Sequence, residues 1–139
     1  MLRVKDVMSR EVRTVQRNDQ LGVADKLMKD ERIRHLPVID ESGDVCAVVS
    51  QRDLFRGALL RSLGYGSRAE ETLLRQVVVK EAMSADLFTT TPDTPVAEAA
   101  RVMVERRIGC LPVLDGGKLV GIVTETDFVR LIADGKSAK

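Results

Sequence analysis

Residues 33–40 read IRHLPVID, and residues 108–115 read IGCLPVLD. The two stretches lie 75 residues apart and share their Ile, their Leu-Pro-Val and their closing Asp. Proline fixes φ and lacks a backbone N–H, so within a sheet it belongs at an edge or at the entry of a strand. A recurring apolar run of this kind indicates an internal duplication, which decides the fold before any single motif does.

The match extends outward from these stretches in both directions. Upstream, residues 4–9 (VKDVMS) align with residues 79–84 (VKEAMS). Downstream, after one residue is lost in a turn, residues 48–53 (VVSQRD) align with residues 122–127 (IVTETD). The copies share 17 identities over 52 aligned pairs, whereas unrelated segments of average composition share roughly 5–8% of their residues. The chain therefore consists of two copies of one ancestral segment.

Each copy predicts the order β-α-β-β-α, with a short strand, an amphipathic helix, a hairpin and a second helix. In the first copy the short strand is expected at 12–15, and the first helix follows the cap Asn18-Asp19 with an apolar stripe of Leu21, Ala24 and Met28. The hairpin strands are expected at 36–39 and 45–49, and the second helix begins at about Gln51. In the second copy the first helix follows the cap Thr94, has Pro95 at its first position and has the apolar stripe Val96, Ala99 and Met103. The hairpin strands are expected at 111–114 and 119–123, and the second helix begins at about Glu125.

The predicted fold class is α+β, with repeat 1 over residues 1–60, repeat 2 over residues 79–135 and a helical linker over residues 61–78. Within the linker, Gly64-Tyr65-Gly66 breaks a helix and Ser67-Arg68-Ala69-Glu70 is close to a capping box. A repeat of about 55 residues is marginal by itself. We therefore expect the repeats to pack about a pseudo-twofold axis, with ligand clefts between them.

Composition argues against several classes of function. The 139 residues include 22 basic and 21 acidic side chains, so no basic excess indicates nucleic-acid binding. The longest apolar runs are too short to span a bilayer, and the N-terminus lacks an apolar signal segment, so we expect a cytoplasmic protein with no membrane partner. Cys46, Cys110 and the single His35 do not form a zinc set, and Cys46 is typical of a small buried hydrophobe.

The ordered set of motifs, Met-Ser, then Leu-Pro-Val, then a hydroxyl residue three positions before an Asp, occurs twice. This set resembles the CBS-domain family over about residues 3–133. The resemblance implies a compact regulatory module without catalytic activity or a required cofactor. It further implies an adenosine ligand (AMP, ADP, ATP or S-adenosylmethionine), a homodimer, and a regulated protein that the sequence does not identify.

Two motifs, Ser50-x-x-Asp53 and Thr124-x-x-Asp127, stand where a strand ends and a helix begins. They have two readings. Ser or Thr followed by an acid three residues later is close to a capping box, while a helix start can also receive a phosphate. The resemblance implies that Asp53 and Asp127 bind a ribose and that Ser50 and Thr124 help to hold phosphate.

The resemblance places the adenine ring against the segments around Leu-Pro-Val and near Thr14 and Thr89. The alternative is that the apolar residues there are core. The predicted ligand-binding residues beyond the two motifs are Thr14, Arg34, His35, Leu36, Pro37 and Arg52 in the first copy, and Thr89, Gly109, Cys110, Leu111, Pro112 and Thr126 in the second.

The two predicted sites differ in charge. Arg34 and Arg52 would favour a phosphate in the first copy, although both could also be solvated surface charges. In the second copy Glu125 precedes Thr126, and Gly109 leaves room for a base. Ala47 stands where the second copy and the family pattern have glycine (Gly121), and its methyl could crowd a ligand or have no effect.

Two rival functions remain. A catalytic pair of His35 and Cys110 is conceivable because these residues occupy equivalent positions. An oligomerisation module without ligand is the other rival, since the helices after the hairpins have apolar residues beyond one core-facing stripe, which favours a homodimer. Those residues are Leu54, Phe55, Leu59, Leu60 and Leu63, and Phe128, Val129, Leu131 and Ile132.

Overall fold

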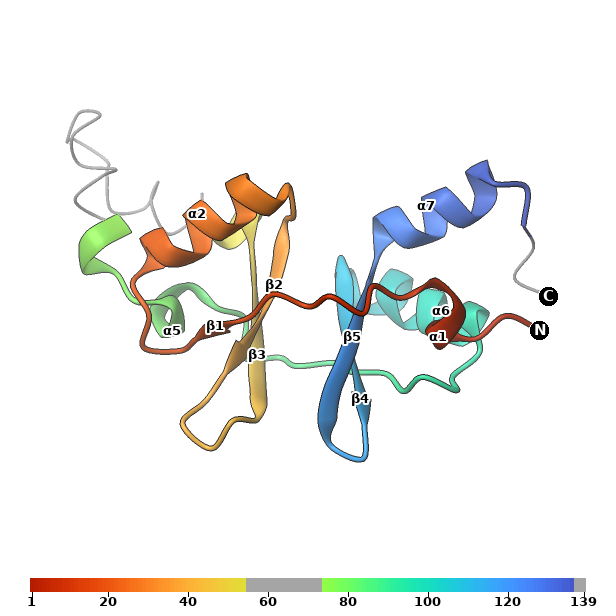
Figure 1. The fold of residues 1–139 in the computed structure, drawn as a ribbon, viewed down its shortest axis with the longest axis horizontal. Helices are drawn as coiled ribbons and strands as arrows, with labels where there is room; N and C mark the ends of the chain where they lie inside the picture. Colours follow the sequence, from red (N-terminus) through yellow and green to blue (C-terminus); the bar gives the residue numbers. More distant parts are fainter. Residues whose placement is uncertain (55–73, 137–139) are drawn as a thin grey trace. The chain divides into compact units, whose positions relative to one another are not determined.

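The computed structural model describes residues 1–54 and 74–136. Its named elements combine short helices with small sheets, so the chain has an α+β fold (Figure 1). In chain order they are α1 (Val4–Val7), β1 (Val15–Gln16), α2 (Leu21–Glu31), β2 (His35–Ile39), β3 (Val45–Ser50), α5 (Val79–Ala82), α6 (Val96–Arg106), β4 (Cys110–Asp115), β5 (Lys118–Thr124) and α7 (Glu125–Ala133). A helix also begins at Gln51, directly after β3.

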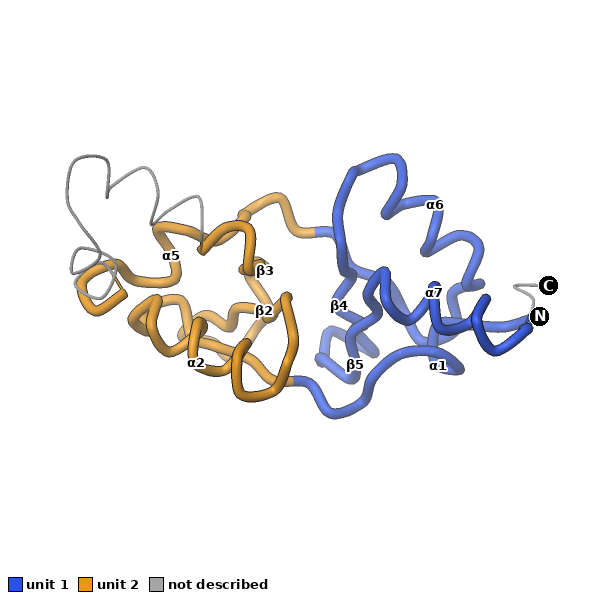
Figure 2. Tube along the Cα trace, turned by 90° about the horizontal axis from the view of Figure 1, so that it is seen from above, with its two compact units in different colours: residues 1–12, 88–139 blue, residues 13–87 orange. Residues whose placement is uncertain are grey.

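The chain forms two compact units that cut across the sequence repeats (Figure 2). Unit 1 combines Met1–Val12 with Phe88–Lys139, and unit 2 is Arg13–Leu87. The opening helix of the first copy, α1, therefore belongs with the hairpin of the second copy, and α5 belongs with the hairpin of the first. The duplication is a property of the sequence, whereas the folded units exchange their opening segments.

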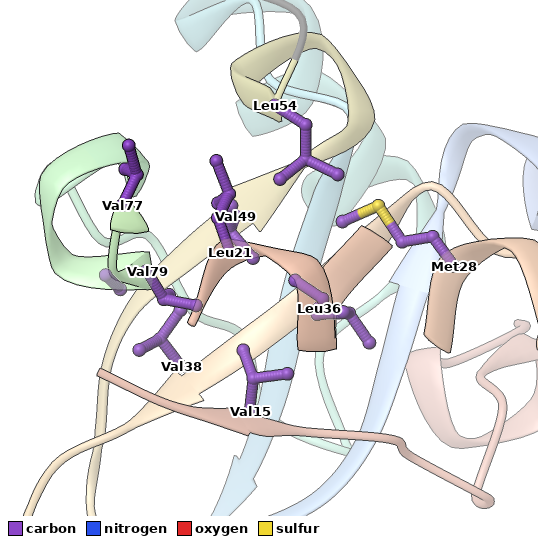
Figure 3. Close-up of a cluster of buried hydrophobic side chains, with 11 residues drawn as sticks. Val15, Leu21, Met28, Leu36, Val38, Val49, Leu54, Val77 and Val79 are labelled. Atoms are coloured by element: carbon purple, nitrogen blue, oxygen red, sulfur yellow. The ribbon is translucent and has the colours of Figure 1, made fainter. Parts of the chain in front are cut away.

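Unit 2 contains a three-stranded sheet in the order β1-β2-β3. β1 runs parallel to β2, and β2 runs antiparallel to β3 with His35 opposite Ser50. Since neighbouring strand residues point to opposite faces, Leu36 and Val49 enter the core while His35 and Ser50 face the other way. The core gathers side chains from the sheet, α2 and α5 (Figure 3).

Unit 1 is built on the antiparallel hairpin β4-β5, with Cys110 opposite Thr124. Thr90 takes the place of a first strand through a single parallel bridge: its N–H donates to the Pro112 carbonyl (3.0 Å) and its carbonyl accepts from the Leu114 N–H (2.9 Å). The core combines Val4 of the exchanged segment with residues of α6 and the hairpin. This core is therefore incomplete without the first residues of the chain.

The exchanged N-terminal segment, residues 1–12, is bonded along its length to the rest of unit 1. The Val4 N–H donates to the Thr94 carbonyl (2.9 Å), and Ser9 and Ile122 exchange two backbone hydrogen bonds of 2.9 and 3.0 Å. Gly121 lies so close that an added Cβ would be 2.6 Å from Met8 Sδ and 2.9 Å from the Ser9 carbonyl oxygen. A glycine is needed there because the segment packs directly on β5.

The aligned contact in unit 2 accommodates an alanine. Ser84 and Val48 exchange backbone hydrogen bonds, of which the Val48 N–H to Ser84 carbonyl bond is 3.3 Å and its reverse is 2.9 Å. The Ala47 side chain is fully buried in the core cluster of unit 2. The methyl that could have crowded a ligand is therefore a core group.

The predicted hairpins and apolar stripes are confirmed, while the helix starts differ. The N-cap of α2 is Gln20, and the Asp19 carboxylate instead accepts the Gln16 N–H (2.8 Å). The N-cap of α6 is Pro95 rather than Thr94, whose hydroxyl oxygen accepts the Thr91 N–H (3.4 Å). These side chains close turns just ahead of the helices, a role that short polar residues share with capping.

Other boundaries also differ from the expectation. The first strand expected over 12–15 lies at Val15–Gln16, and the second copy has only the Thr90 bridge in its place. The predicted linker helix start at residues 67–70 and its break at residues 64–66 lie outside the described residues, as do Phe55, Leu59, Leu60 and Leu63.

Candidate functional site

In unit 2, the end of β3 brings Ser50 and Asp53 together in a reciprocal capping box. The Ser50 N–H donates to Asp53 Oδ2 (2.8 Å), and the Asp53 N–H donates to Ser50 Oγ (3.1 Å). His35 lies directly opposite Ser50 in the sheet, and the Gln51 N–H donates to the Arg34 carbonyl (2.8 Å). Predicted site residues from two distant segments therefore meet at one end of the hairpin.

The end of β5 in unit 1 repeats this arrangement. The Thr124 N–H donates to Asp127 Oδ2 (2.8 Å), and Thr124 Oγ1 lies 3.4 Å from the same oxygen. Cys110 lies opposite Thr124, and the Glu125 N–H donates to the Gly109 carbonyl (3.1 Å). The two units thus present the same backbone frame with different side chains.

Both aspartates use one carboxylate oxygen for capping, as the first of the two sequence readings expects. Within the described residues, the other oxygen of Asp53 accepts no hydrogen bond, and Asp127 Oδ1 has an ion pair with Arg130 Nη1 at 3.8 Å. An ionised carboxylate offers about four lone-pair sites. Capping therefore leaves acceptor capacity in each carboxylate, and a ligand can share it.

Arg130 is a site neighbour that the sequence reading missed. It lies three residues after Asp127 on α7, a spacing at which helical side chains meet, and this spacing could have revealed it. The Asp127 side chain is only 11% exposed. Its carboxylate contacts the Thr124 N–H at the helix start through one oxygen and the Arg130 guanidinium through the other.

The remaining predicted residues divide into three environments. Leu36 and Leu111 are fully buried in the core clusters, so their side chains follow the core alternative and only their backbone groups can face a ligand. The exposed residues are Thr14, Thr89, Arg34, Arg52 and Thr126. The half-buried ones are Gly109 and His35, and the buried ones are Pro37, Pro112 and Cys110.

The threonines lie next to the strand pairings that the adenine prediction requires. Thr14 precedes Val15, which pairs with Val38 of β2, and Thr89 precedes Thr90, which bridges to Val113 of β4. Each threonine therefore borders the hairpin of its own unit, at the edge opposite the second hairpin strand.

The two cysteines belong to different units, and Cys46 in unit 2 does not have the environment of an activated thiol. Cys46 packs against the unit 2 core, and burial raises the pKa of its thiol. Cys110 begins β4 in unit 1, whereas His35 begins β2 in unit 2. The two members of the conceivable catalytic pair thus occupy equivalent positions in different units.

Metal-binding clusters and membrane-spanning helices are both absent from the described ranges, 1–54 and 74–136. No group of three or more His, Cys, Asp or Glu side chains in them could hold a metal ion. None of their helices is long and apolar enough to cross a membrane.

Comparison with known proteins gives relatives of very different lengths. Protein MJ1404 of Methanocaldococcus jannaschii is 35% identical over 137 residues, an alignment that covers 96% of this chain and 32% of that protein. A CBS domain-containing protein of Dictyostelium discoideum is 33% identical over 130 residues, covering 93% of this chain and 90% of that protein. This chain therefore spans about a third of the first relative and most of the second.

Solved structures extend the similarity to the whole fold. The CBS domain pair of protein MJ0100, crystallised in complex with 5'-methylthioadenosine and S-adenosyl-L-methionine, has a TM-score of 0.79 at 28% identity, covering 98% of this chain and 99% of that chain. Residues 4–59 and 79–134 each match the CBS domain family. The chain therefore belongs to the CBS domain family and contains two tandem copies of its repeat.

Proposed function

We propose that this chain is a regulatory module that binds adenosine-containing ligands, namely AMP, ADP, ATP or S-adenosylmethionine, at the hairpin ends of its units. One observation carries the proposal: Asp53 and Asp127 are part-buried carboxylates, each beside a hydroxyl and each with one oxygen that the capping bonds do not use. Such a carboxylate can serve as an acceptor at a strand end without losing its role in the fold.

The chemistry of a ribose fits this acceptor. Its 2'- and 3'-hydroxyls are adjacent donors, and an ionised carboxylate accepts short, strong hydrogen bonds from such groups. Ser50 Oγ accepts the Asp53 N–H and can still donate to a phosphate oxygen or to a bound water. Thr124 Oγ1 can do the same once it gives up its long, 3.4 Å hydrogen bond to Asp127 Oδ2. The MJ0100 complex supports an adenosine-containing ligand, because methylthioadenosine and S-adenosylmethionine share the adenosine group, although neither contains a phosphate.

A second candidate function is an interaction module that dimerises and has no small ligand. Val129 and Ile132 of α7 are 67% and 71% exposed, whereas Phe128 and Leu131 of the same helix face the core. Exposed apolar side chains one turn apart can form part of an interface. Dimerisation is compatible with ligand binding, so the two proposals differ only in whether a ligand binds.

Calorimetric titration of the full chain with AMP, ATP and S-adenosylmethionine tests the proposal. We expect saturable binding of at least one ligand, and a loss of roughly tenfold to a hundredfold in affinity when Asp53→Asn or Asp127→Asn removes the charge at the occupied site. Asparagine keeps an acceptor oxygen for the capping N–H, so the circular dichroism spectrum serves as the folding control.

The outcomes separate the two candidate functions. Absence of binding heat for all three ligands at millimolar concentration contradicts the sensor proposal and leaves the interaction module. Binding that the double variant retains at the parent's affinity contradicts the ribose role of the two aspartates.

A further inference from the structure

The two units differ in charge at three aligned positions around the same backbone frame. Unit 2 has Arg34 and Arg52, where unit 1 has Gly109 and Thr126. Unit 1 in turn has Glu125 where unit 2 has the neutral Gln51. Two arginines in one unit against one glutamate in the other make a difference of three formal charges.

Backbone hydrogen bonds bring these charges to the candidate sites. The Gln51 N–H to Arg34 carbonyl bond (2.8 Å) sets residue 34 beside the start of the helix that contains Arg52 and Asp53. The Glu125 N–H to Gly109 carbonyl bond (3.1 Å) does the same in unit 1. Arg34, Arg52 and Glu125 are all exposed, so a ligand at either hairpin end would meet them without burying an unpaired charge.

The two aspartates do not cancel this difference in charge, and the residue of the first copy that aligns with Arg130 is also an arginine. Asp53 and Asp127 occupy aligned positions and contribute equally. Arg130, whose Nη1 lies 3.8 Å from Asp127 Oδ1, aligns with Arg56 of the first copy. The asymmetry therefore comes from the two arginines and from Glu125.

We infer that the two units select different classes of adenosine ligand. Unit 2 takes phosphorylated adenosine, because guanidinium groups form charge-assisted, often bidentate bonds with phosphate. Unit 1 takes an uncharged or cationic adenosine derivative, such as a thioether or sulfonium nucleoside, because Glu125 repels phosphate and attracts a positive group. This inference rests on the proposed function and adds the ligand class of each site.

A charge exchange between the units tests the inference. One variant removes both positive charges from unit 2 (Arg34→Gln with Arg52→Thr), and another removes the negative charge from unit 1 and adds a basic group (Glu125→Gln with Thr126→Arg). Arg101→Gln, at an exposed position of α6 outside the candidate-site residues, is the control for loss of one positive charge. Amide chemical shifts of Ser50 and Thr124 report which unit binds.

The titrations use ATP, AMP, methylthioadenosine and S-adenosylmethionine. In the parent, ATP should shift the Ser50 amide at lower concentration than the Thr124 amide, and S-adenosylmethionine should do the reverse. Because the arginines are exposed and partly screened, the first variant should lose on the order of tenfold in ATP affinity at unit 2, with methylthioadenosine unchanged. The second variant should gain ATP affinity at unit 1, and the control should match the parent.

Other results overturn the inference or its foundation, and they are distinguishable. Equal affinities of both ligand classes at both units, or ATP binding at unit 2 that survives loss of both arginines, contradict the charge selection while the proposed function stands. No shift at either amide with any of the four ligands contradicts the proposed function as well.

Discussion

Replacing Gly121 with alanine perturbs the contact between β5 and the exchanged N-terminal segment. The added Cβ would lie 2.6 Å from Met8 Sδ and 2.9 Å from the Ser9 carbonyl oxygen. The methionine side chain can rotate away, but the carbonyl oxygen is fixed by its 3.0 Å hydrogen bond from the Ile122 N–H. The segment must therefore move outward, as the 3.3 Å bond beside Ala47 in unit 2 indicates.

The magnitude of this effect follows from two opposing contributions. Overpacking a tight site typically costs about 1–3 kcal/mol. Gly121 does not have a positive φ, so alanine adds no backbone strain, and it removes about 0.5–1 kcal/mol of the entropy cost of an ordered glycine. The net destabilisation is roughly 0–2.5 kcal/mol with a middle value of about 1 kcal/mol, or up to about 10 °C in Tm for a chain of this size.

Thermal denaturation followed by circular dichroism measures the change. Met8→Ala in the Gly121→Ala background removes the sulfur contact, so part of the destabilisation should be recovered as a coupling energy between the two positions. A Gly121→Ala variant that melts at or above the parent's Tm, together with no coupling to position 8, would refute the packing of residues 1–12 against β5.

Three further predictions concern the caps, a surface ion pair and assembly. Asp53→Ala should lower the free energy of unfolding by roughly 0.5–2 kcal/mol, because the capping bond is lost, whereas Asp53→Asn should recover most of it; equal melting of the two variants would exclude a capping role. Hydrogen bonding and charge from Lys5, 3.0 Å away, lower the pKa of Asp93, so the pair should stabilise the fold above the ordinary aspartate pKa and cease to do so as pH falls through the lower folded value. A Lys5→Met variant should then have a lower Tm than the parent near neutral pH and the same Tm in strong acid. A Tm difference that does not change with pH would contradict a stabilising Lys5–Asp93 pair. We also expect a homodimer in light scattering at about 10–100 μM, the range of weak association, which Val129→Ser with Ile132→Ser should convert to monomer; a monomeric parent would contradict the assembly proposal.

Much of the fold could be predicted because its signals are local. The hairpin strands are short apolar runs joined by turn residues, and Leu21, Ala24 and Met28 recur at helical spacing, so the hairpins and stripes follow from local sequence patterns. The duplication then doubled the support for each element. All three stripe residues of α2 are buried as expected.

The exchange of opening segments could not be predicted from these signals. Residues 1–12 pair with Thr94 and Ile122, which lie some 90 to 113 positions away along the chain, and no local pattern specifies so distant a partner. The Gly121/Ala47 difference was visible in the sequence. Its meaning became clear only from the segment that packs on β5.

The local geometry of the two Ser/Thr-x-x-Asp motifs was predicted better than the contacts around them. The motif spacing correctly placed Ser50 with Asp53 and Thr124 with Asp127, because three residues make one turn at a helix start. The ion pair of Arg130 with Asp127 depends on side-chain geometry. Helix starts were misplaced by one or two residues since Asp19 and Thr94 close turns instead of capping, a choice that residue type alone does not decide.

The most direct test of ribose binding by Asp53 and Asp127 is a thermodynamic cycle that removes the ribose hydroxyls from the ligand and the carboxylate charges from the protein, separately and together. Calorimetry would compare AMP with 2',3'-dideoxy-AMP on the parent and on the Asp53→Asn, Asp127→Asn double variant. Losing the hydroxyls should cost the parent roughly tenfold or more in affinity and should cost the double variant little, because the partner carboxylates are gone. If the dideoxy ligand binds the parent as tightly as AMP, or loses the same factor on the variant, the two aspartates do not hold the ribose.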